Sequence, residues 1–177
     1  MMGFELNILD WLQTLHTPGA DKFMTSVTKL GNAGILWIIL TLIFLIIPKM
    51  RKTGVIMAAA LLTDLLICNV FLKNIVARTR PYDVNTTVEL LVEKLRDYSF
   101  PSGHTAASFA SVTALYLAGE RRLWIIALVI SCLIAVSRLY LYVHYPTDVL
   151  GGIIFGCLSG WIGYHIVRFT ERKMTAR

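Results

Sequence analysis

Two uncharged stretches decide the fold of this chain: LGNAGILWIILTLIFLIIP at residues 30–48 and VLGGIIFGCLSGWIGYHIV at residues 149–167. Each has close to the ~20 residues that an α-helix needs to cross a lipid bilayer. The composition agrees, since 56% of the 177 residues are hydrophobic and only 16% are charged, whereas about 25% are charged in an ordinary soluble domain. The sequence therefore predicts a helical membrane protein rather than a free-standing soluble domain.

Three further apolar runs predict membrane spans at residues 53–72, 103–119 and 123–137. Together with the two uncharged stretches they predict an all-α integral membrane helical bundle of about five transmembrane helices. The connection at residues 82–100 is the one long polar segment between spans, and its sequence VELLVEKLR is expected to form a short surface helix.

Two features inside the spans call for an interior environment. Asp64 is costly to expose to lipid, so we expect it to face the bundle and to have a structural hydrogen-bond partner rather than a catalytic role. Gly152, Gly156 and Gly160 recur every four residues. Such a stripe of small residues lets a neighbouring helix approach closely, and we expect it to serve packing within the bundle.

The N-terminal segment has the pattern of a helix that lies in the membrane interface. Large apolar residues recur on one side of FELNILDWLQTLHT at helical spacing, and they are Phe4, Ile8, Trp11, Leu12 and Leu15. Thr17-Pro18-Gly19 then separates this helix from a second amphipathic piece. We expect one domain, 1–177, with interfacial helices at 1–31, a transmembrane bundle at 32–170 and a cytoplasmic tail at 171–177.

Lysine and arginine residues are distributed unequally between the two ends of the predicted helices. One end collects Lys49, Arg51, Lys52, Arg121, Arg122, Arg168, Arg172, Lys173 and Arg177. The other end has Lys22, Lys29, Lys94 and Arg96, offset by Glu5, Asp10, Asp21, Glu89, Glu93 and Asp97. The positive-inside rule makes the first end cytoplasmic. The N-terminus, the 82–100 connection and the 142–148 turn then share the extracytoplasmic face of the cytoplasmic membrane.

The net charge of +6 does not indicate a nucleic-acid partner, because the cations are scattered at the ends of spans rather than gathered in a stripe. The expected surroundings are membrane lipids. The sequence carries no indication of an oligomeric state.

A first polar cluster at the outer face contains Lys73, Arg80 and Pro81. Lys73 and Arg80 are seven residues apart, so on a helix of about 3.6 residues per turn they would point the same way, with Pro81 ending the helix. Arg78 follows Lys73 by five residues and would point about 140° away. We therefore expect Arg78 to be a surface anchor outside the site.

Two more polar clusters belong to the same face. In PSGH, residues 101–104, a helix begins, so that free backbone N–H groups near Ser102, Gly103 and His104 can bind an anion. In the third cluster, Asp148 lies in the first turn of the last helix, where it can reach one imidazole nitrogen of His144 and leave the other free to attack.

Each cluster alone has an ordinary explanation as an interfacial anchor, a capped helix start or a turn. Together they place three cations, two histidines and a carboxylate at one face of a small bundle. The ligand that such a set has in common is an anion.

The same three segments resemble a known family. KNIVARTRP (residues 73–81), PSGH (101–104) and SRLYLYVHYPTD (137–148) are similar to the motifs KxxxxxxRP, PSGH and SRxxxxxHxxxD of the type-2 phosphatidic acid phosphatase superfamily. That superfamily includes membrane lipid phosphatases, soluble bacterial acid phosphatases and vanadium haloperoxidases. The resemblance implies an all-helical fold and hydrolysis of a phosphomonoester or diphosphate through a phosphohistidine.

The resemblance also implies roles for individual residues. The catalytic residues would be His144 as nucleophile, Asp148 as its orienting partner and His104 as the acid that protonates the leaving oxygen. The phosphate-binding residues would be Lys73, Arg80, Ser102, Gly103 and Arg138. No metal or other cofactor is expected, because positioned cations and amides can stabilise the charge of a transferred phosphoryl group.

The expected substrate is a lipid phosphate or diphosphate, such as undecaprenyl diphosphate, phosphatidic acid or phosphatidylglycerophosphate. The diphosphate is slightly favoured by analogy with small bacterial members of the superfamily. An anion-binding transporter without hydrolysis is the main alternative; it would use Asp64 and the basic cluster but would leave two separately placed histidines unexplained. Vanadate-dependent halide oxidation is a third interpretation, against which the membrane spans argue.

Overall fold

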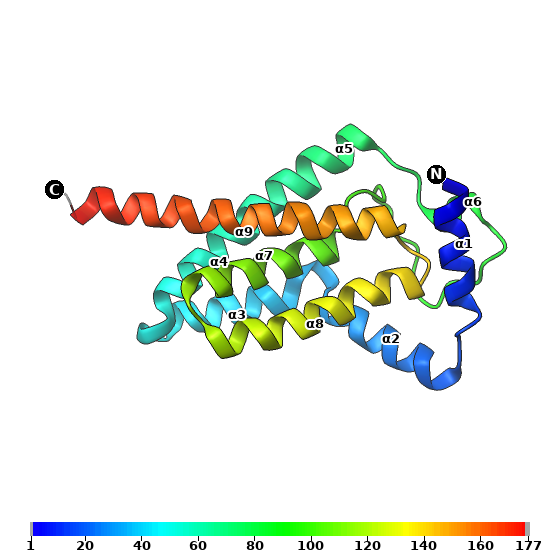
Figure 1. Cartoon of the computed structure of the whole chain (residues 1–177), viewed down its shortest axis with the longest axis horizontal. Coiled ribbons are helices and arrows are strands. Elements are labelled where there is room, and N and C mark those ends of the chain that lie inside the picture. The colour runs from blue at the N-terminus through cyan, green and yellow to red at the C-terminus, as the bar shows by residue number, and fades with distance from the viewer. Residues whose placement is uncertain (1, 176–177) are drawn as a thin grey trace.

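The structure, a computed structural model, describes residues 2–175, and these form an all-helical bundle without β-strands (Figure 1). The α-helices within this range are α1 (Met2–Gln13), α2 (Pro18–Leu30), α3 (Ile35–Ile46), α4 (Arg51–Asp64), α5 (Lys73–Val76), α6 (Pro81–Val84), α7 (Gly103–Ala118), α8 (Arg121–Tyr140) and α9 (Pro146–Thr175). The turns η1 (Asn32–Gly34) and η2 (Pro48–Met50) and a π-helical stretch, η3 (Leu65–Leu72), connect some of them. The predicted all-α bundle is confirmed.

Three helical stretches in this range are long and apolar enough to cross a membrane: Pro48–Val84, Arg121–Tyr140 and Pro146–Thr175. The bent pair Pro18–Leu30 and Asn32–Ile46, with 42° between its halves, adds a fourth if it counts as one span. The remaining predicted span is α7, which has 16 residues. Each of the five predicted spans thus contains a helix. Three of them are long and apolar enough to span a membrane alone, and a fourth is so only together with α2 as a bent pair.

Close packing of α7 on α9 lies at the centre of the bundle. A Cβ added to Gly156 would lie 2.4 Å from the carbonyl oxygen of Ala106, and one added to Gly160 would lie 2.6 Å from that of Ala110. Backbone oxygens cannot move aside as flexible side chains can, so this contact requires glycine. The prediction that the glycine stripe serves packing within the bundle is confirmed.

The helix that carries Lys73 ends earlier than expected. α4 continues through η3 into α5, which stops at Val76 because Ala77 has a left-handed backbone (φ 46°). Arg80 lies beyond this end, and Pro81 begins α6 instead of closing the longer helix. The prediction that Lys73 and Arg80 share one helix is therefore wrong.

The predicted surface helix at residues 88–96 is also absent, and this segment is an irregular loop. Val88, Leu90 and Val92 pack against the buried residues around Tyr142. These side chains alternate along the chain, which is the period of an extended segment with one buried side rather than of a helix.

The first uncharged stretch is interrupted near its start. α2 ends at Leu30, and α3 begins at Ile35 after a tight turn in which Ala33 and Gly34 have positive φ angles. Gly31, Asn32 and Gly34 are turn residues inside a run that apolarity alone assigns to one span.

α1 lies across one end of the bundle beside α6, whereas α9 reaches the opposite end (Figure 1). Tyr142 of the turn after α8 donates a hydrogen bond to Asp10 of α1 at 2.7 Å and accepts one from Asn85 of the long connection at 3.1 Å. The N-terminus, the connection and the turn before α9 are thus grouped at one end, as predicted. Arg177, one of the cations assigned to the other end, lies outside the described residues.

Within α1, Phe4 and Trp11 are exposed, whereas Glu5 and Leu9 are buried against the rest of the protein. An outward-facing apolar side suits a helix in the membrane interface. Its position in the interface stays a prediction. The buried acidic residue on the opposite side was not expected.

Candidate active site

The residues of the three predicted clusters meet at the end of the bundle that α1 covers. They come from α5 (Lys73), the residue before α6 (Arg80), the start of α7 (Ser102, Gly103 and His104), the last turn of α8 (Arg138) and the turn into α9 (His144 and Asp148). Lys73, Arg80, Ser102, Arg138, His144 and Asp148 are buried. Burying three cations together is costly unless anions compensate them, so this end of the bundle is built to hold negative charge.

Arg80 is held rigidly beside the imidazole of His144. Its Nε donates to the carbonyl oxygen of Asp97 at 2.8 Å, and its Nη1 donates to that of Val143 at 2.8 Å. Nη1 also lies 3.4 Å from Nε2 of His144. A cation fixed at this position can bind an oxygen of any anion that reaches Nε2.

His144 and Asp148 face one another across the turn before α9. Nδ1 of His144 lies 3.6 Å from Oδ2 of Asp148, which is an ion-pair distance and longer than a hydrogen bond. Oδ2 instead accepts hydrogen bonds from Ser99 Oγ at 2.5 Å and from the backbone N–H of Tyr145 at 2.9 Å. Nδ1 of His144 thus faces Asp148 as predicted, but it has no hydrogen-bond partner among the described residues, while Nε2 lies beside Arg80.

The imidazole of His144 is kept neutral by its surroundings. Burial, together with the Arg138 and Arg80 cations, lowers its pKa to about 3, and the Asp148 carboxylate only partly opposes them. A neutral imidazole has a lone pair on one nitrogen, as a nucleophile needs.

Arg138 also acts on His144 through its charge, and part of its guanidinium has no hydrogen-bond partner among the described residues. Its Nη1 donates to Thr28 Oγ1 at 2.5 Å, but its buried Nε–H has no partner among the described residues. Arg138 and His104 both line a cavity of about 590 Å³ between α2, α8 and the long connection. Because an unsatisfied buried donor is costly, an acceptor such as a phosphate oxygen would be stabilised there.

The start of α7 presents fewer free N–H groups than predicted. The N–H of Ser102 donates to the carbonyl oxygen of Asp148 at 3.0 Å, so it is not available to an anion. The N–H groups of Gly103 and His104, in the first turn of α7, are the ones that could still bind an anion. A Cβ on Gly103 would lie 2.9 Å from Asn69 Oδ1 and 3.7 Å from Lys73 Nζ, which places this helix start directly against the lysine.

His104 is positioned by the turn between α2 and α3. Its Nε2 lies 2.9 Å from Oδ1 of Asn32. A Cβ on Gly31 would lie 2.7 Å from Cδ2 of His104, so the imidazole fits against a residue without a side chain. Sequence reasoning missed both residues because it treated them only as the start of an apolar span.

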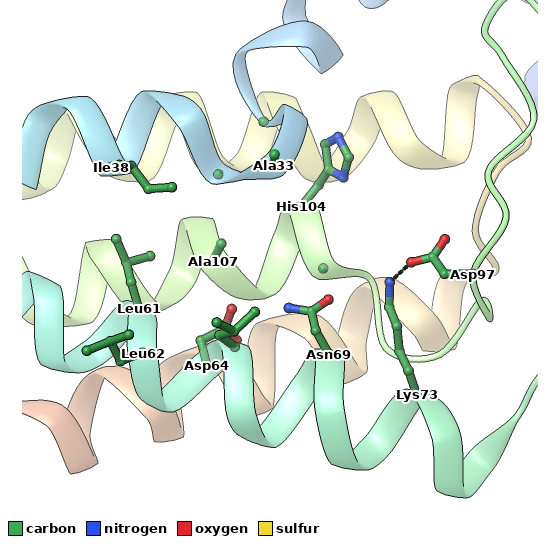
Figure 2. A pocket seen from close by; sticks show the side chains of 14 residues that line it. Ala33, Ile38, Leu61, Leu62, Asp64, Asn69, Lys73, Asp97, His104 and Ala107 are labelled. Carbon is green, nitrogen blue, oxygen red and sulfur yellow. Dashed lines mark hydrogen bonds and ion pairs between the residues drawn. The ribbon is translucent and has the colours of Figure 1, made fainter.

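Asp97 is a further site residue that sequence reasoning treated only as a surface charge. Its carboxylate pairs with Lys73 Nζ through one oxygen and with Arg80 Nη2 at 2.6 Å through the other (Figure 2). Burial by itself would raise the pKa of Asp97, but the two cations outweigh it and hold the pKa at about 2. A carboxylate of the protein itself thus pairs with two of the cations that were expected to bind phosphate.

A cavity of about 470 Å³ extends from Lys73 and His104 along α3, α4 and α7. Figure 2 shows Lys73, Asp97 and His104 at one end of it and the apolar side chains of Ile38 and Leu61 at the other. The cavity therefore joins an end lined by ionisable side chains to an apolar end.

Asp64 lies on the wall of the same cavity (Figure 2). It is buried in the bundle as predicted. Its Oδ1 has no hydrogen-bond partner among the described residues, so for this oxygen the expected structural partner is absent.

The family model of the PAP2 superfamily matches residues 53–172. The chain belongs to the PAP2 superfamily. This PAP2 chain is 28% identical to an undecaprenyl-diphosphatase of Sulfolobus acidocaldarius over 92% of its own length and 77% of the relative's. It is 35% identical to phosphatidylglycerophosphatase B of Bacillus subtilis over 81% and 73% of the two lengths.

The crystal structure of LpxE from Aquifex aeolicus aligns with the PAP2 chain at a TM-score of 0.78 and 28% identity, covering 89% of this chain and 93% of that one. The family resemblance seen in the three motifs is therefore confirmed, and the protein is a phosphatase whose relatives act on lipid phosphates. Its individual site residues keep their roles as predictions.

Replacing Asp97 with Asn should strengthen the binding of anions to the site, because the internal carboxylate no longer competes for Lys73 and Arg80. We expect the inhibition constant of orthovanadate to fall by up to about fivefold, which corresponds to the ~1 kcal/mol upper value of a partly exposed ion pair. The matched control is Asp83→Asn, which removes another exposed carboxylate of the same connection. Unchanged or weaker inhibition of Asp97→Asn would contradict this interpretation.

The same substitution should lower the thermal stability of the ligand-free protein at pH 7. The pKa of Asp97 is lower in the folded protein, about 2, than in the unfolded chain, about 3.9. Its contribution to stability is therefore present above about pH 4 and is lost as the pH falls towards 2. Thermal unfolding of both proteins in detergent between pH 7 and pH 3 measures this difference, which should narrow at low pH.

Proposed function

We propose that this PAP2 protein is an integral-membrane lipid phosphatase that removes the terminal phosphate of a lipid phosphate or diphosphate, with His144 as the nucleophile. The observation that carries the proposal is the cavity that connects Lys73 and His104 to apolar side chains of α3 and α4. A molecule with an anionic head and an apolar chain matches both ends of this cavity.

The geometry supports a two-step reaction. Nε2 of His144 attacks phosphorus, and the bond from phosphorus to the leaving oxygen breaks while His104 donates a proton to that oxygen. Lys73, Arg80, Arg138 and the N–H of Gly103 stabilise the charge on the other phosphate oxygens. Water then attacks the phosphohistidine, His104 accepts its proton, and inorganic phosphate leaves with His144 restored. No step needs a metal or another cofactor.

The substrate that we favour is a polyprenyl diphosphate such as undecaprenyl diphosphate. The similarity to the undecaprenyl-diphosphatase of Sulfolobus acidocaldarius, which aligns over 92% of this chain, supports this choice. The similarity to phosphatidylglycerophosphatase B keeps phosphatidylglycerophosphate and phosphatidic acid as the competing substrates. A transporter without hydrolysis is no longer favoured, because the two relatives that align over most of this chain, described above, are named as phosphatases.

Release of inorganic phosphate from these three lipids by the purified protein tests the proposal. Activity should persist in excess EDTA, because the positive charge that a metal would supply comes from three side chains. Undecaprenyl diphosphate should give the highest kcat/KM. Loss of all activity in EDTA, with recovery on adding Mg²⁺ or Zn²⁺, would overturn the metal-free mechanism. Failure to release phosphate from any of the three lipids would overturn the proposal of a lipid phosphatase.

Substitution of the two histidines should separate nucleophile from acid. His144→Ala should abolish turnover of every substrate, since no phosphoenzyme can form. His104→Ala should cost about 10²–10⁴-fold with phosphatidic acid, whose leaving group is a basic alkoxide. The loss should be smaller with a diphosphate, whose leaving group is itself a phosphate with a pKa near about 6.

Labelling with ³²P-substrate measures the intermediate directly. An acid-labile, base-stable label should survive in His104→Ala with the diphosphate and disappear in His144→Ala. A label that depends on His104 and persists in His144→Ala would reverse the assignment of the two histidines.

We place the site on the extracytoplasmic face of the cytoplasmic membrane, because the end of the bundle opposite the site carries the excess of Lys and Arg. In a variant with Cys68, Cys132 and Cys157 replaced by Ala, a cysteine at position 94 should react with a membrane-impermeant maleimide in intact cells. A cysteine at position 121 should react only after lysis. The reverse pattern would place the site in the cytoplasm.

A further inference from the structure

Arg78 is partly buried at the back of the candidate active site and contacts the residues that follow His144. Its Nη1 donates to Oδ1 of Asp148 at 2.6 Å and to Oγ1 of Thr147 at 2.7 Å. Its guanidinium carbon lies 3.8 Å from the centre of the Tyr145 ring. The expectation that Arg78 is a surface anchor outside the site is therefore wrong.

The position of Arg78 follows from the end of α5. Its direction was predicted from a continuous helix, but the helix stops at Val76 and Ala77 turns the backbone with a positive φ. Arg78 therefore leaves the helix direction and reaches the first turn of α9, where its neighbours are Thr147 and Asp148.

Glu5 of α1 holds Arg78 from the opposite side. Its Oε2 accepts from Arg78 Nη2 at 2.5 Å, and its Oε1 accepts from the N–H and the hydroxyl of Thr147 at 3.0 and 2.6 Å. Glu5 is only 4% exposed. This carboxylate is buried and accepts hydrogen bonds from Arg78 and Thr147 through both of its oxygens, so the contact differs from a surface ion pair.

We propose that Arg78, held by Glu5 of the N-terminal helix, is a positioning residue for the His144–Asp148 pair. The side-chain hydrogen bonds of Arg78 go to Thr147, Asp148 and Glu5 and not to the predicted phosphate-binding residues. Arg78 holds Oδ1 of Asp148, while Ser99 and the N–H of Tyr145 hold Oδ2. The carboxylate is thereby fixed in the orientation that faces Nδ1 of His144, and α1 supports the catalytic turn.

The charges around His144 determine how each substitution should change the pKa of its imidazole. The imidazole faces Asp148 of α9, Arg138 of α8, Arg80 before α6 and His104 of α7. Arg78 neutralises part of the charge of Asp148, so its removal should raise the pKa of His144. Removal of Glu5 frees Arg78 to act on Asp148 alone and should lower the pKa of His144.

Steady-state kinetics of Arg78→Gln, Arg78→Lys and Glu5→Gln, as full chains in detergent, test the proposal. Arg78→Gln should lower kcat by about 10–100-fold, the usual cost of losing a residue that orients a catalytic group, with KM nearly unchanged. Its acid limb of kcat/KM should move to higher pH, and that of Glu5→Gln to lower pH. Arg78→Lys should recover part of kcat, because it keeps the charge but not the two-pronged geometry.

Arg96→Gln is the matched control, since it removes an exposed arginine at the same end of the protein, and it should leave kcat and the pH profile unchanged. The combined Glu5→Gln and Arg78→Gln variant should show less than the sum of the two losses, because the residues act through one contact. Equal pH shifts in both single variants, or losses confined to KM, would overturn the proposal.

This inference rests on His144 acting as nucleophile, and the two failures are distinguishable. An active His144→Ala protein would contradict the proposed function, in which His144 is the nucleophile. An inactive His144→Ala protein together with an unaltered Arg78→Gln protein would remove only the role of Arg78. If Arg78→Gln does not fold, the opposite pH shift of Glu5→Gln and the partial activity of Arg78→Lys still decide the question.

Discussion

Positive charge buried at one end of an apolar bundle is the constraint on which the rest of this structure depends. Lys73, Arg80 and Arg138 are each at least nine-tenths buried, and such groups are tolerated only when anions or hydrogen-bond acceptors surround them. Asp97 supplies a carboxylate to two of them, while the buried Nε–H of Arg138 has no acceptor among the described residues. The proposed phosphate site would complete this arrangement, with a phosphate in the place of Asp97 and as acceptor for Arg138.

Helix packing decides where the remaining groups lie. A Cβ on Gly152 of α9 would lie 2.8 Å from the carbonyl oxygen of Ser102. The same approach of the two helices joins the N–H of Ser102 to the carbonyl oxygen of Asp148 at 3.0 Å. The start of α7 and the start of α9 are therefore locked together, and with them the two histidines that lie beside these helix starts. The glycines of α9 thus fix the relative position of these two helix starts.

Compensating charge also connects the N-terminal helix to the site. Glu5 and Asp148 share Arg78, so a helix whose outer side displays Phe4 and Trp11 contributes its inner side to the support of His144. The exposed and the buried sides of α1 therefore have different partners, and only the buried side contacts the turn that carries Asp148.

The sequence by itself determined the helical membrane class, the approximate spans and the family, because apolar run length and the spacing of Lys73, Arg80, His104, Arg138, His144 and Asp148 are local properties of the chain. Only the tertiary structure decided the contacts of Arg78, Glu5, Asp97 and Asn32. Arg78 was placed by assuming a regular helix, whereas a left-handed residue ends that helix first. The partners of Glu5 and Asp97 are contributed by distant segments, and the burial that makes those ion pairs necessary arises only when the helices pack.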